Sequence, residues 1–110
     1  MVNGCKKGKA FEREVAIRLR SIFPNARRHL ENHEDDAARG ADLIFTGSYR
    51  FQLKKLKKYA PITCIEELTV DRMLGEIPVL ITAGDFLEPM VVMPFEEFLK
   101  ILKRLHPGGL

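Results

Sequence analysis

The sequence contains no tryptophan, only two cysteines, and few aromatic residues, which make up 8% of its 110 residues. The cysteines, Cys5 and Cys64, lie far apart, which predicts free thiols rather than the disulfide framework of a small secreted domain. The longest apolar run, Ile77–Ala83, is much shorter than the roughly 20 residues that a membrane-spanning helix needs. The first residues, MVNGCKK, lack the apolar stretch of a secretory signal. We therefore expect a cytoplasmic protein with no membrane segment.

Charge is distributed unevenly along the chain, although the net formal charge is only +3. Residues 1–60 carry 14 Lys and Arg against 7 Asp and Glu, whereas residues 61–110 carry 4 against 8. A basic half of this kind is typical of a surface that faces a polyanion such as a nucleic acid. A well-solvated basic surface without a partner is the alternative interpretation of the same charges.

Hydrophobic residues make up 45% of the chain and charged residues 30%, which suffices for one core and a polar surface at this length. Apolar residues recur at helical spacing in some segments, and other segments alternate or are continuously apolar, as strands are. The expected helices are 8–23, 61–68 and one that begins at Pro94. The expected strands are 26–30, 41–45, 49–54, 79–83 and 90–93, with a polar loop over 31–40. This order predicts a single α/β domain with a mixed central sheet flanked by helices, and flexible ends at 1–7 and 106–110.

Three polar residues fall on two neighbouring strands of this predicted sheet. In strand 41–45, Asp42 alternates with apolar neighbours on the other face. In strand 49–54, Gln52 and Lys54 share one face. An acid, an amide and an amine therefore project from adjacent strands, and they converge if all three share one face of the sheet.

The loop between these two strands decides whether the groups converge. A three-residue loop over 46–48 pairs Asp42 with Gln52, so that their side chains share a face. A two-residue turn pairs Asp42 with Leu53 instead and separates the polar groups. A site built from them therefore requires the three-residue loop or a bulge, for which Gly47 supplies the left-handed conformation.

Glu12 is a fourth polar residue that fits this arrangement. It follows Phe11, an apolar residue of the predicted first helix, and therefore borders the face that packs on the sheet. A carboxylate in this position reaches over the edge of a sheet on which its helix lies.

The segments GKAFEREVAIRL, RGADLIF and FQLKK follow one another in that order, and a Pro-flanked apolar strand and a final helix come after them. This succession resembles the PD-(D/E)XK nuclease superfamily, and within it the archaeal Holliday-junction resolvases and the Mrr-like restriction endonuclease domains. The resemblance covers roughly residues 8–103. It implies a restriction-endonuclease-like fold and hydrolysis of DNA phosphodiester bonds that depends on Mg²⁺ or Mn²⁺.

The resemblance also assigns roles to the polar residues. Asp42 matches the metal-binding aspartate, Glu12 the glutamate of the first helix, and Lys54 the catalytic lysine. Gln52 stands where most members carry a glutamate, as it does in Mrr-like members. The expected metal ligands are the side chains of Asp42, Glu12 and Gln52 and the carbonyl of Leu53, which are the hard oxygen donors that Mg²⁺ prefers. Lys54 would orient the attacking water or stabilise the developing negative charge.

Basic residues occur on both sides of this predicted site in the sequence. The expected DNA-binding residues are Lys6, Lys7, Lys9, Arg13, Arg27, Arg28, Arg39, Arg50, Lys55, Lys57 and Lys58. Contacts of this type go to phosphates and make binding sensitive to salt. Aromatic residues do not interleave with them, so we expect branched or duplex DNA as the partner rather than a stacked single strand.

Other interpretations of these residues remain open. Asp42 also suits a turn, and Gln52 and Lys54 also suit the solvated face of an edge strand. Gln52 in place of glutamate also fits a catalytically silent DNA-binding module, and the acidic second half fits a subunit of a larger nucleic-acid enzyme. A domain of this size offers little surface to a duplex, so we expect a homodimer formed through residues 90–93 and the C-terminal helix.

Overall fold

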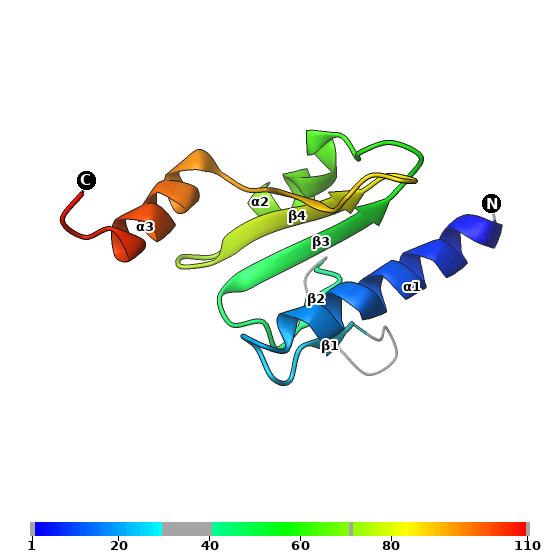
Figure 1. Ribbon diagram of the computed structural model, residues 1–110, viewed down its shortest axis with the longest axis horizontal. Coiled ribbons are helices and arrows are strands. Elements are labelled where there is room, and N and C mark those ends of the chain that lie inside the picture. The colour runs from blue at the N-terminus through cyan, green and yellow to red at the C-terminus, as the bar shows by residue number, and fades with distance from the viewer. Residues whose placement is uncertain (1, 30–40, 71, 110) are drawn as a thin grey trace.

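The computed structural model describes residues 2–29, 41–70 and 72–109 (Figure 1). Its elements are α1 (Val2–Leu19), β1 (Arg27–Arg28), β2 (Leu43–Ile44), β3 (Tyr49–Lys55), the short 3₁₀ helix η1 (Ile62–Ile65), α2 (Glu66–Val70), β4 (Ile77–Ala83), β5 (Met90–Val92) and α3 (Phe95–Leu105). Strands β3 and β4 run parallel, and β5 lies antiparallel to β4 in the same sheet. Strands β1 and β2 form a separate antiparallel pair. The predicted α/β architecture with a mixed sheet is confirmed.

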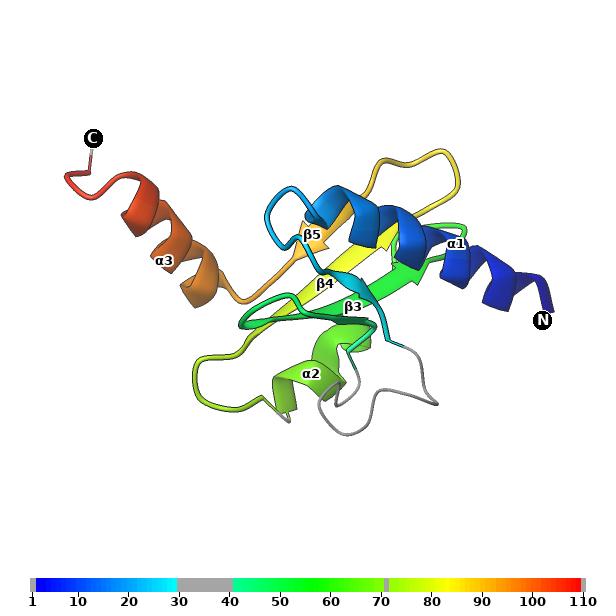
Figure 2. The ribbon, with the colours of Figure 1, turned by 90° about the horizontal axis from the view of Figure 1, so that it is seen from below.

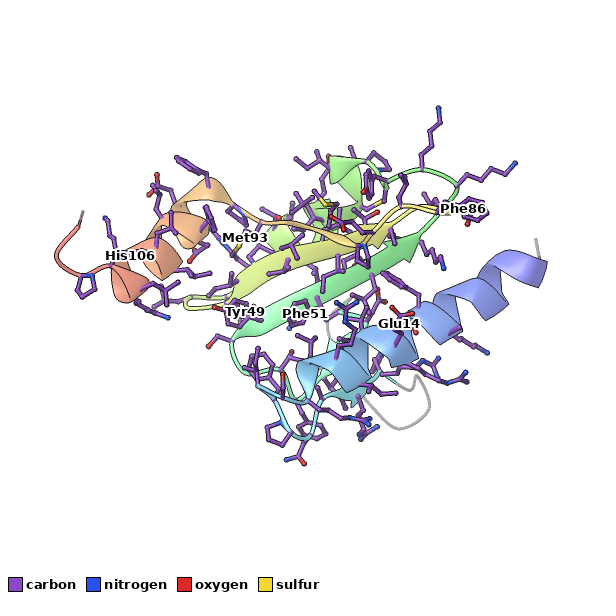
Figure 3. The ribbon with its side chains drawn as sticks, in the orientation of Figure 1. Glu14, Tyr49, Phe51, Phe86, Met93 and His106 are labelled. Atoms are coloured by element: carbon purple, nitrogen blue, oxygen red, sulfur yellow. The ribbon has the colours of Figure 1, made fainter. Side chains whose placement is uncertain are left out.

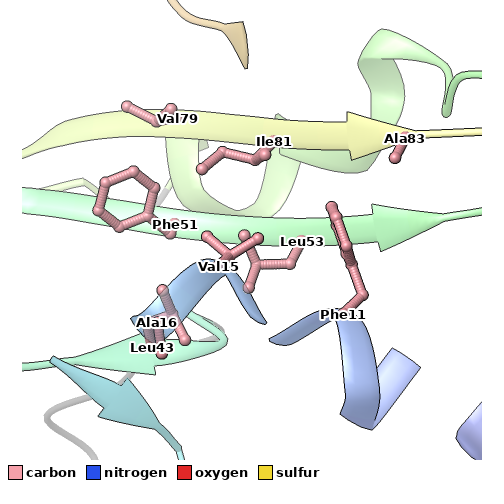
Figure 4. Packing of buried hydrophobic residues seen from close by; sticks show 9 residues of the cluster. All are labelled: Phe11, Val15, Ala16, Leu43, Phe51, Leu53, Val79, Ile81 and Ala83. Carbon is pink, nitrogen blue, oxygen red and sulfur yellow. The ribbon is translucent and has the colours of Figure 1, made fainter. Parts of the chain in front are cut away.

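The mixed sheet lies between α1 on one face and η1 with α2 on the other (Figure 2). Side chains alternate along β3, so Phe51 and Leu53 face α1 while Gln52 and Lys54 face the opposite side. The core under α1 is closed by nine buried residues (Figure 4): Phe11, Val15, Ala16, Leu43, Phe51, Leu53, Val79, Ile81 and Ala83. At the start of β3 the rings of Tyr49 and Phe51 stack with centroids 6.2 Å apart (Figure 3).

The opposite face of the sheet is closed by η1 and α2. Leu68 of α2 and Leu80 of β4 are both almost fully buried there. The Thr82 hydroxyl accepts a hydrogen bond of 2.7 Å from the Ala60 backbone N–H, which fixes the chain that enters η1. A buried hydroxyl with such a partner avoids the cost of an unmet hydrogen bond.

The first helix differs from the prediction at both ends, because α1 begins at Val2 rather than at residue 8 and ends at Leu19 rather than at Phe23. After Leu19 the chain closes one further turn, in which the Phe23 N–H donates to the Leu19 carbonyl at 2.8 Å. Pro24 limits the helix here, because its ring disfavours helical geometry in the preceding residue. The Ser21 hydroxyl also donates to the Arg18 carbonyl, which competes with the backbone ladder.

The predicted hairpin of residues 41–45 and 49–54 is wrong as a regular ladder. Strand β2 pairs with β1, whereas β3 takes β4 as its partner. Phe45 and Gly47 both adopt positive φ, 60° and 62°, and so bend the chain out of the sheet after β2. The Thr46 hydroxyl then donates to the Tyr49 carbonyl at 2.8 Å and closes the loop.

The remaining elements agree with the sequence in type more than in extent. The strand expected over 26–30 is reduced to β1, and the helix expected over 61–68 is divided into η1 and α2 after the extended residue Pro61. The strands expected over 79–83 and 90–93 correspond to β4 and β5, which pair antiparallel. The loop expected over 31–40 lies outside the described residues.

Helix α3 extends away from the sheet at the end of the molecule opposite to the start of α1 (Figures 1 and 2). None of its residues is buried, although Phe95 and Leu105 are large and apolar. Its Glu97 reaches back to Arg72 at 3.5 Å. No helix in the described ranges has the length and apolar character needed to cross a membrane.

Candidate active site

Asp42 stands directly before β2 and is attached to β3 by two hydrogen bonds. Its backbone N–H donates to the Phe51 carbonyl at 2.8 Å, and its Oδ2 accepts from the Leu53 N–H at 2.7 Å. These bonds join Asp42 to the two residues that flank Gln52 in β3. The described strands form no ladder between β2 and β3, so the predicted pairing of Asp42 with Gln52 is not formed as a strand register.

The side-chain amide of Gln52, in β3, has an unusual oxygen atom. Its Oε1 atom is buried and has no hydrogen-bond partner among the described residues. An unsatisfied buried acceptor costs about 1–3 kcal/mol, so native structures rarely keep one without a reason. An acceptor without a donor is the group that a cation would satisfy.

The carboxyl of Asp42 is shifted strongly by its surroundings. Burial raises its pKa from 3.8 to about 6, although the hydrogen bond from Leu53 opposes this shift. The negative charge of Glu12 raises the pKa further, and the positive charges of Lys54 and His29 lower it. Glu12 and Lys54 therefore both lie within electrostatic range of Asp42.

Glu12 is held at this edge by an arginine of β1. The Arg28 Nε atom donates to the Glu12 Oε1 atom at 3.0 Å, and each side chain is only about one-fifth exposed. Arg28 lies opposite Leu43 in the β1–β2 pair, and Leu43 belongs to the core under α1. Arg28, predicted as a DNA contact, is therefore first of all the residue that positions Glu12.

His29 is a neighbour of the site that the sequence analysis missed. Its backbone N–H donates to the Asp42 carbonyl at 2.9 Å, which extends the β1–β2 pair by one residue. Only the pairing of residues 27–28 with 43–44 brings it there. The one signal in the sequence was the short strand expected over 26–30, whose partner the sequence did not specify.

The Leu53 carbonyl completes the set of oxygens. In a strand, the N–H and C=O groups of one residue point toward the same neighbouring strand. The Leu53 N–H binds Asp42, so the Leu53 carbonyl is directed to the same edge of β3. Its role as a neutral ligand stays a prediction.

The donor set fits a magnesium-type ion better than a zinc ion. The described residues contain no group of three His, Cys, Asp or Glu side chains that could enclose a metal. Asp42 and Glu12 supply two carboxylates within electrostatic range of each other, whereas Gln52, with its orphaned oxygen, lies on the face of β3 turned away from α1. Mg²⁺ binds through one or two carboxylates and retains several waters, so this incomplete set suits it.

The predicted DNA-binding residues lie on several elements of the fold. Lys9 and Arg13 are exposed on α1, and Lys55, Lys57 and Lys58 are exposed at and after the end of β3. Arg27 and Arg28 are half-buried on β1, Lys6 and Lys7 lie in the first turns of α1, and Arg39 lies outside the described residues. Arg50 does not fit its predicted role, because it is 8% exposed and its guanidinium pairs with Glu76 at 3.5 Å.

Comparison with known proteins identified no relative of this chain. No protein-family model, no curated protein and no solved structure matches it.

Proposed function

We propose that this protein is a metal-dependent DNA endonuclease of the PD-(D/E)XK type. The observation that carries the proposal is the attachment of Asp42 to β3 on both sides of Gln52, with Glu12 and Lys54 within electrostatic range of the Asp42 carboxyl. The mixed sheet flanked by helices, and the succession of segments along it, agree with the fold that the resemblance implies. The sequence pattern and the geometry thus support the same reaction class.

Each residue of the site has a distinct task in phosphodiester hydrolysis. Asp42 and Glu12 would hold Mg²⁺ or Mn²⁺ by their carboxylates, and Gln52 and Leu53 would add neutral oxygens. A divalent metal bound there supplies a Lewis acid and lowers the pKa of a coordinated water. Lys54 places an ammonium group beside the carboxylates, where it balances the negative charge that develops on the phosphate.

A cleavage assay with two adjacent lysines tests the proposed function. Lys54 is half-buried on the site face of β3, whereas Lys55 is exposed on the alternate side. We expect Lys54→Ala to reduce Mg²⁺- or Mn²⁺-dependent cleavage of plasmid or four-way-junction DNA by about 100-fold to 1,000-fold, as removal of a charge-stabilising group does. Lys55→Ala should change the rate by less than about threefold, because it removes only one peripheral phosphate contact.

The same assay separates the competing functions. DNA binding without cleavage in any divalent metal would identify a silent module, for which Gln52 would be the cause. Weak binding even at low salt would favour a subunit that joins a larger enzyme through its acidic half. Equal loss of cleavage in the Lys54 and Lys55 variants would contradict the assignment of Lys54.

We also propose that the protein acts as a homodimer through α3. The apolar face of this helix is exposed, with Phe98 44% and Phe95 69% accessible. Glu96 and Lys103 are seven residues apart and so flank this face on one side. If two copies of α3 pack antiparallel about a two-fold axis, Glu96 of each copy lies opposite Lys103 of the other. The exposed edge strand β5 adjoins this surface and would enlarge it.

Charge-reversal substitutions on α3 test the proposed dimer, with the oligomeric state measured by analytical ultracentrifugation. We expect Glu96→Lys to weaken association about tenfold, because it places like charges together at two symmetric positions. Glu96→Lys combined with Lys103→Glu should restore association. A monomer at all concentrations, or a dimer that neither variant changes, would contradict this interface.

A further inference from the structure

Four arginines converge in a groove between α1 and β1, adjacent to the candidate active site. The groove has a volume of about 280 Å³, and it is lined by Arg13, Ala16, Ile17, Arg20, Arg27 and Arg28. Among the described residues of this lining, none is acidic, although Arg28 pairs with Glu12 next to the groove. The described part of the groove therefore carries a net positive charge.

Three of these arginines are held in place by contacts of their own. The Arg20 Nε atom donates to the Ala26 carbonyl at 3.0 Å, and the Arg28 Nε atom donates to Glu12 at 3.0 Å. The guanidinium of Arg27 lies 5.4 Å from the centre of the Phe45 ring. A guanidinium has five N–H donors, so one bond through Nε fixes its direction and leaves the terminal nitrogens as donors.

The chemistry of this groove selects a phosphate. Fixed guanidinium groups match the tetrahedral oxygens of phosphate with paired hydrogen bonds, which a lysine cluster cannot do. The apolar walls, from Ala16 and Ile17, lower the local polarity and strengthen such bonds. The volume exceeds that of a single phosphate and admits part of a nucleotide beside it.

We propose that the groove binds a backbone phosphate of the DNA substrate, adjacent to the phosphate that is cleaved. This inference rests on the proposed function, because it places the groove along the path of the substrate. Arg28 connects the two places, since it lines the groove and also contacts Glu12 of the active site. Arg20, which the sequence analysis did not select, becomes a substrate-binding residue in this arrangement.

The test is binding of a duplex oligonucleotide in EDTA, where cleavage plays no part. We expect Arg13→Ala and Arg20→Ala each to weaken binding about tenfold and to reduce the salt dependence by about one phosphate contact. The matched control is Arg18→Ala, because Arg18 is exposed on the same helix but pairs with Glu14 and lies outside the groove. It should weaken binding less than about twofold. Arg13 bonds to no other described residue in the structure, so its variant also separates binding from any loss of stability in Arg20→Ala.

A second measurement uses inorganic phosphate and the nitrogen-15 NMR signals of the arginine side chains. We expect the Nε signals of Arg20 and Arg28 to shift on titration while that of Arg18 does not. Equal effects of all three alanine variants on DNA binding, or no selective shift, would overturn the proposal and leave only general charge attraction. If the groove variants bind DNA as the unaltered protein does and the protein cleaves DNA, the proposal of phosphate binding in the groove is contradicted and the proposed nuclease function is retained. If no DNA is cleaved but DNA binding and the NMR signals distinguish the groove arginines from Arg18, phosphate binding in the groove is supported and the nuclease function is contradicted.

Discussion

Asp42→Asn is expected to abolish metal-dependent cleavage and at the same time to stabilise the metal-free protein. The asparagine keeps an oxygen that can accept the Leu53 N–H, so the link between β2 and β3 persists. It removes the negative charge that a divalent cation requires, and we expect the cleavage rate to fall by about 1,000-fold or more. The rate is measured on plasmid or junction DNA with saturating Mn²⁺.

The stabilising effect follows from the raised pKa of Asp42. The pKa of Asp42 is about 6 in the folded protein, whereas its ordinary pKa is 3.8. The folded state therefore holds more protons between these values, and stability falls as the pH rises through this range. Above pH 6 the unaltered protein retains the full cost of a buried charge, which Asp42→Asn removes. We expect a gain of about 2 kcal/mol in the free energy of unfolding at pH 8 in EDTA.

Urea unfolding at pH 4 and pH 8 measures this difference. At pH 4 the two proteins should be closer in stability, because Asp42 is then mostly protonated in the folded protein. Glu14→Gln is the control, since Glu14 is an exposed carboxylate on α1 and should leave both rate and stability unchanged. An Asp42→Asn variant that cuts DNA normally, or that is less stable at pH 8, would contradict the description of this site.

Gln52→Glu is expected to strengthen metal binding by about tenfold or more, because ligand charge governs the affinity of hard cations. The new carboxylate adds a negative charge on the residue of β3 that stands between the two bonds to Asp42. Without metal, two carboxylates repel each other there, so the variant should be less stable in EDTA than the unaltered protein. Calorimetric titration with Mn²⁺ and unfolding with and without the ion measure both effects.

Gln52→Met is the matched control for that variant. It keeps a similar length but removes the buried Oε1 atom that has no partner within the described chain. We expect weaker Mn²⁺ binding and little loss of stability in EDTA, because the deleted Oε1 atom accepts no hydrogen bond from the described residues. If Glu and Met at position 52 bind Mn²⁺ equally well, Gln52 does not contact the metal, and the silent-module interpretation gains support.

The types of the elements were predictable from local patterns, whereas their pairing was not. The apolar run of β4 and the alternation of β3 both lie in the sequence itself. The choice of β1 as partner of β2 depends on residues far apart in the chain and on the positive φ of Phe45, a conformation that phenylalanine rarely adopts. Local propensity carries no information about either.

The site was predictable where it depends on alternation along strands. Gln52 and Lys54 share a face because they are two residues apart, and Asp42 is bonded to their strand at Phe51 and Leu53. The contribution of His29 was not predictable, because it depends on the β1–β2 pair. The burial of Arg50 also depends on tertiary structure, since its partner Glu76 is 26 residues away. Charge alone could not distinguish this arginine from one on the surface.

The contact between Arg28 and Glu12 has a thermodynamic consequence. A cation that recruits Glu12 must compete with the guanidinium that already neutralises it. A DNA phosphate that binds Arg28 removes that competitor. The metal ion and the DNA therefore each raise the affinity of the protein for the other by the same factor. We expect the metal ion to bind mainly after the DNA strand has bound. Binding of the substrate therefore raises the affinity for the metal, and the protein without DNA holds little metal.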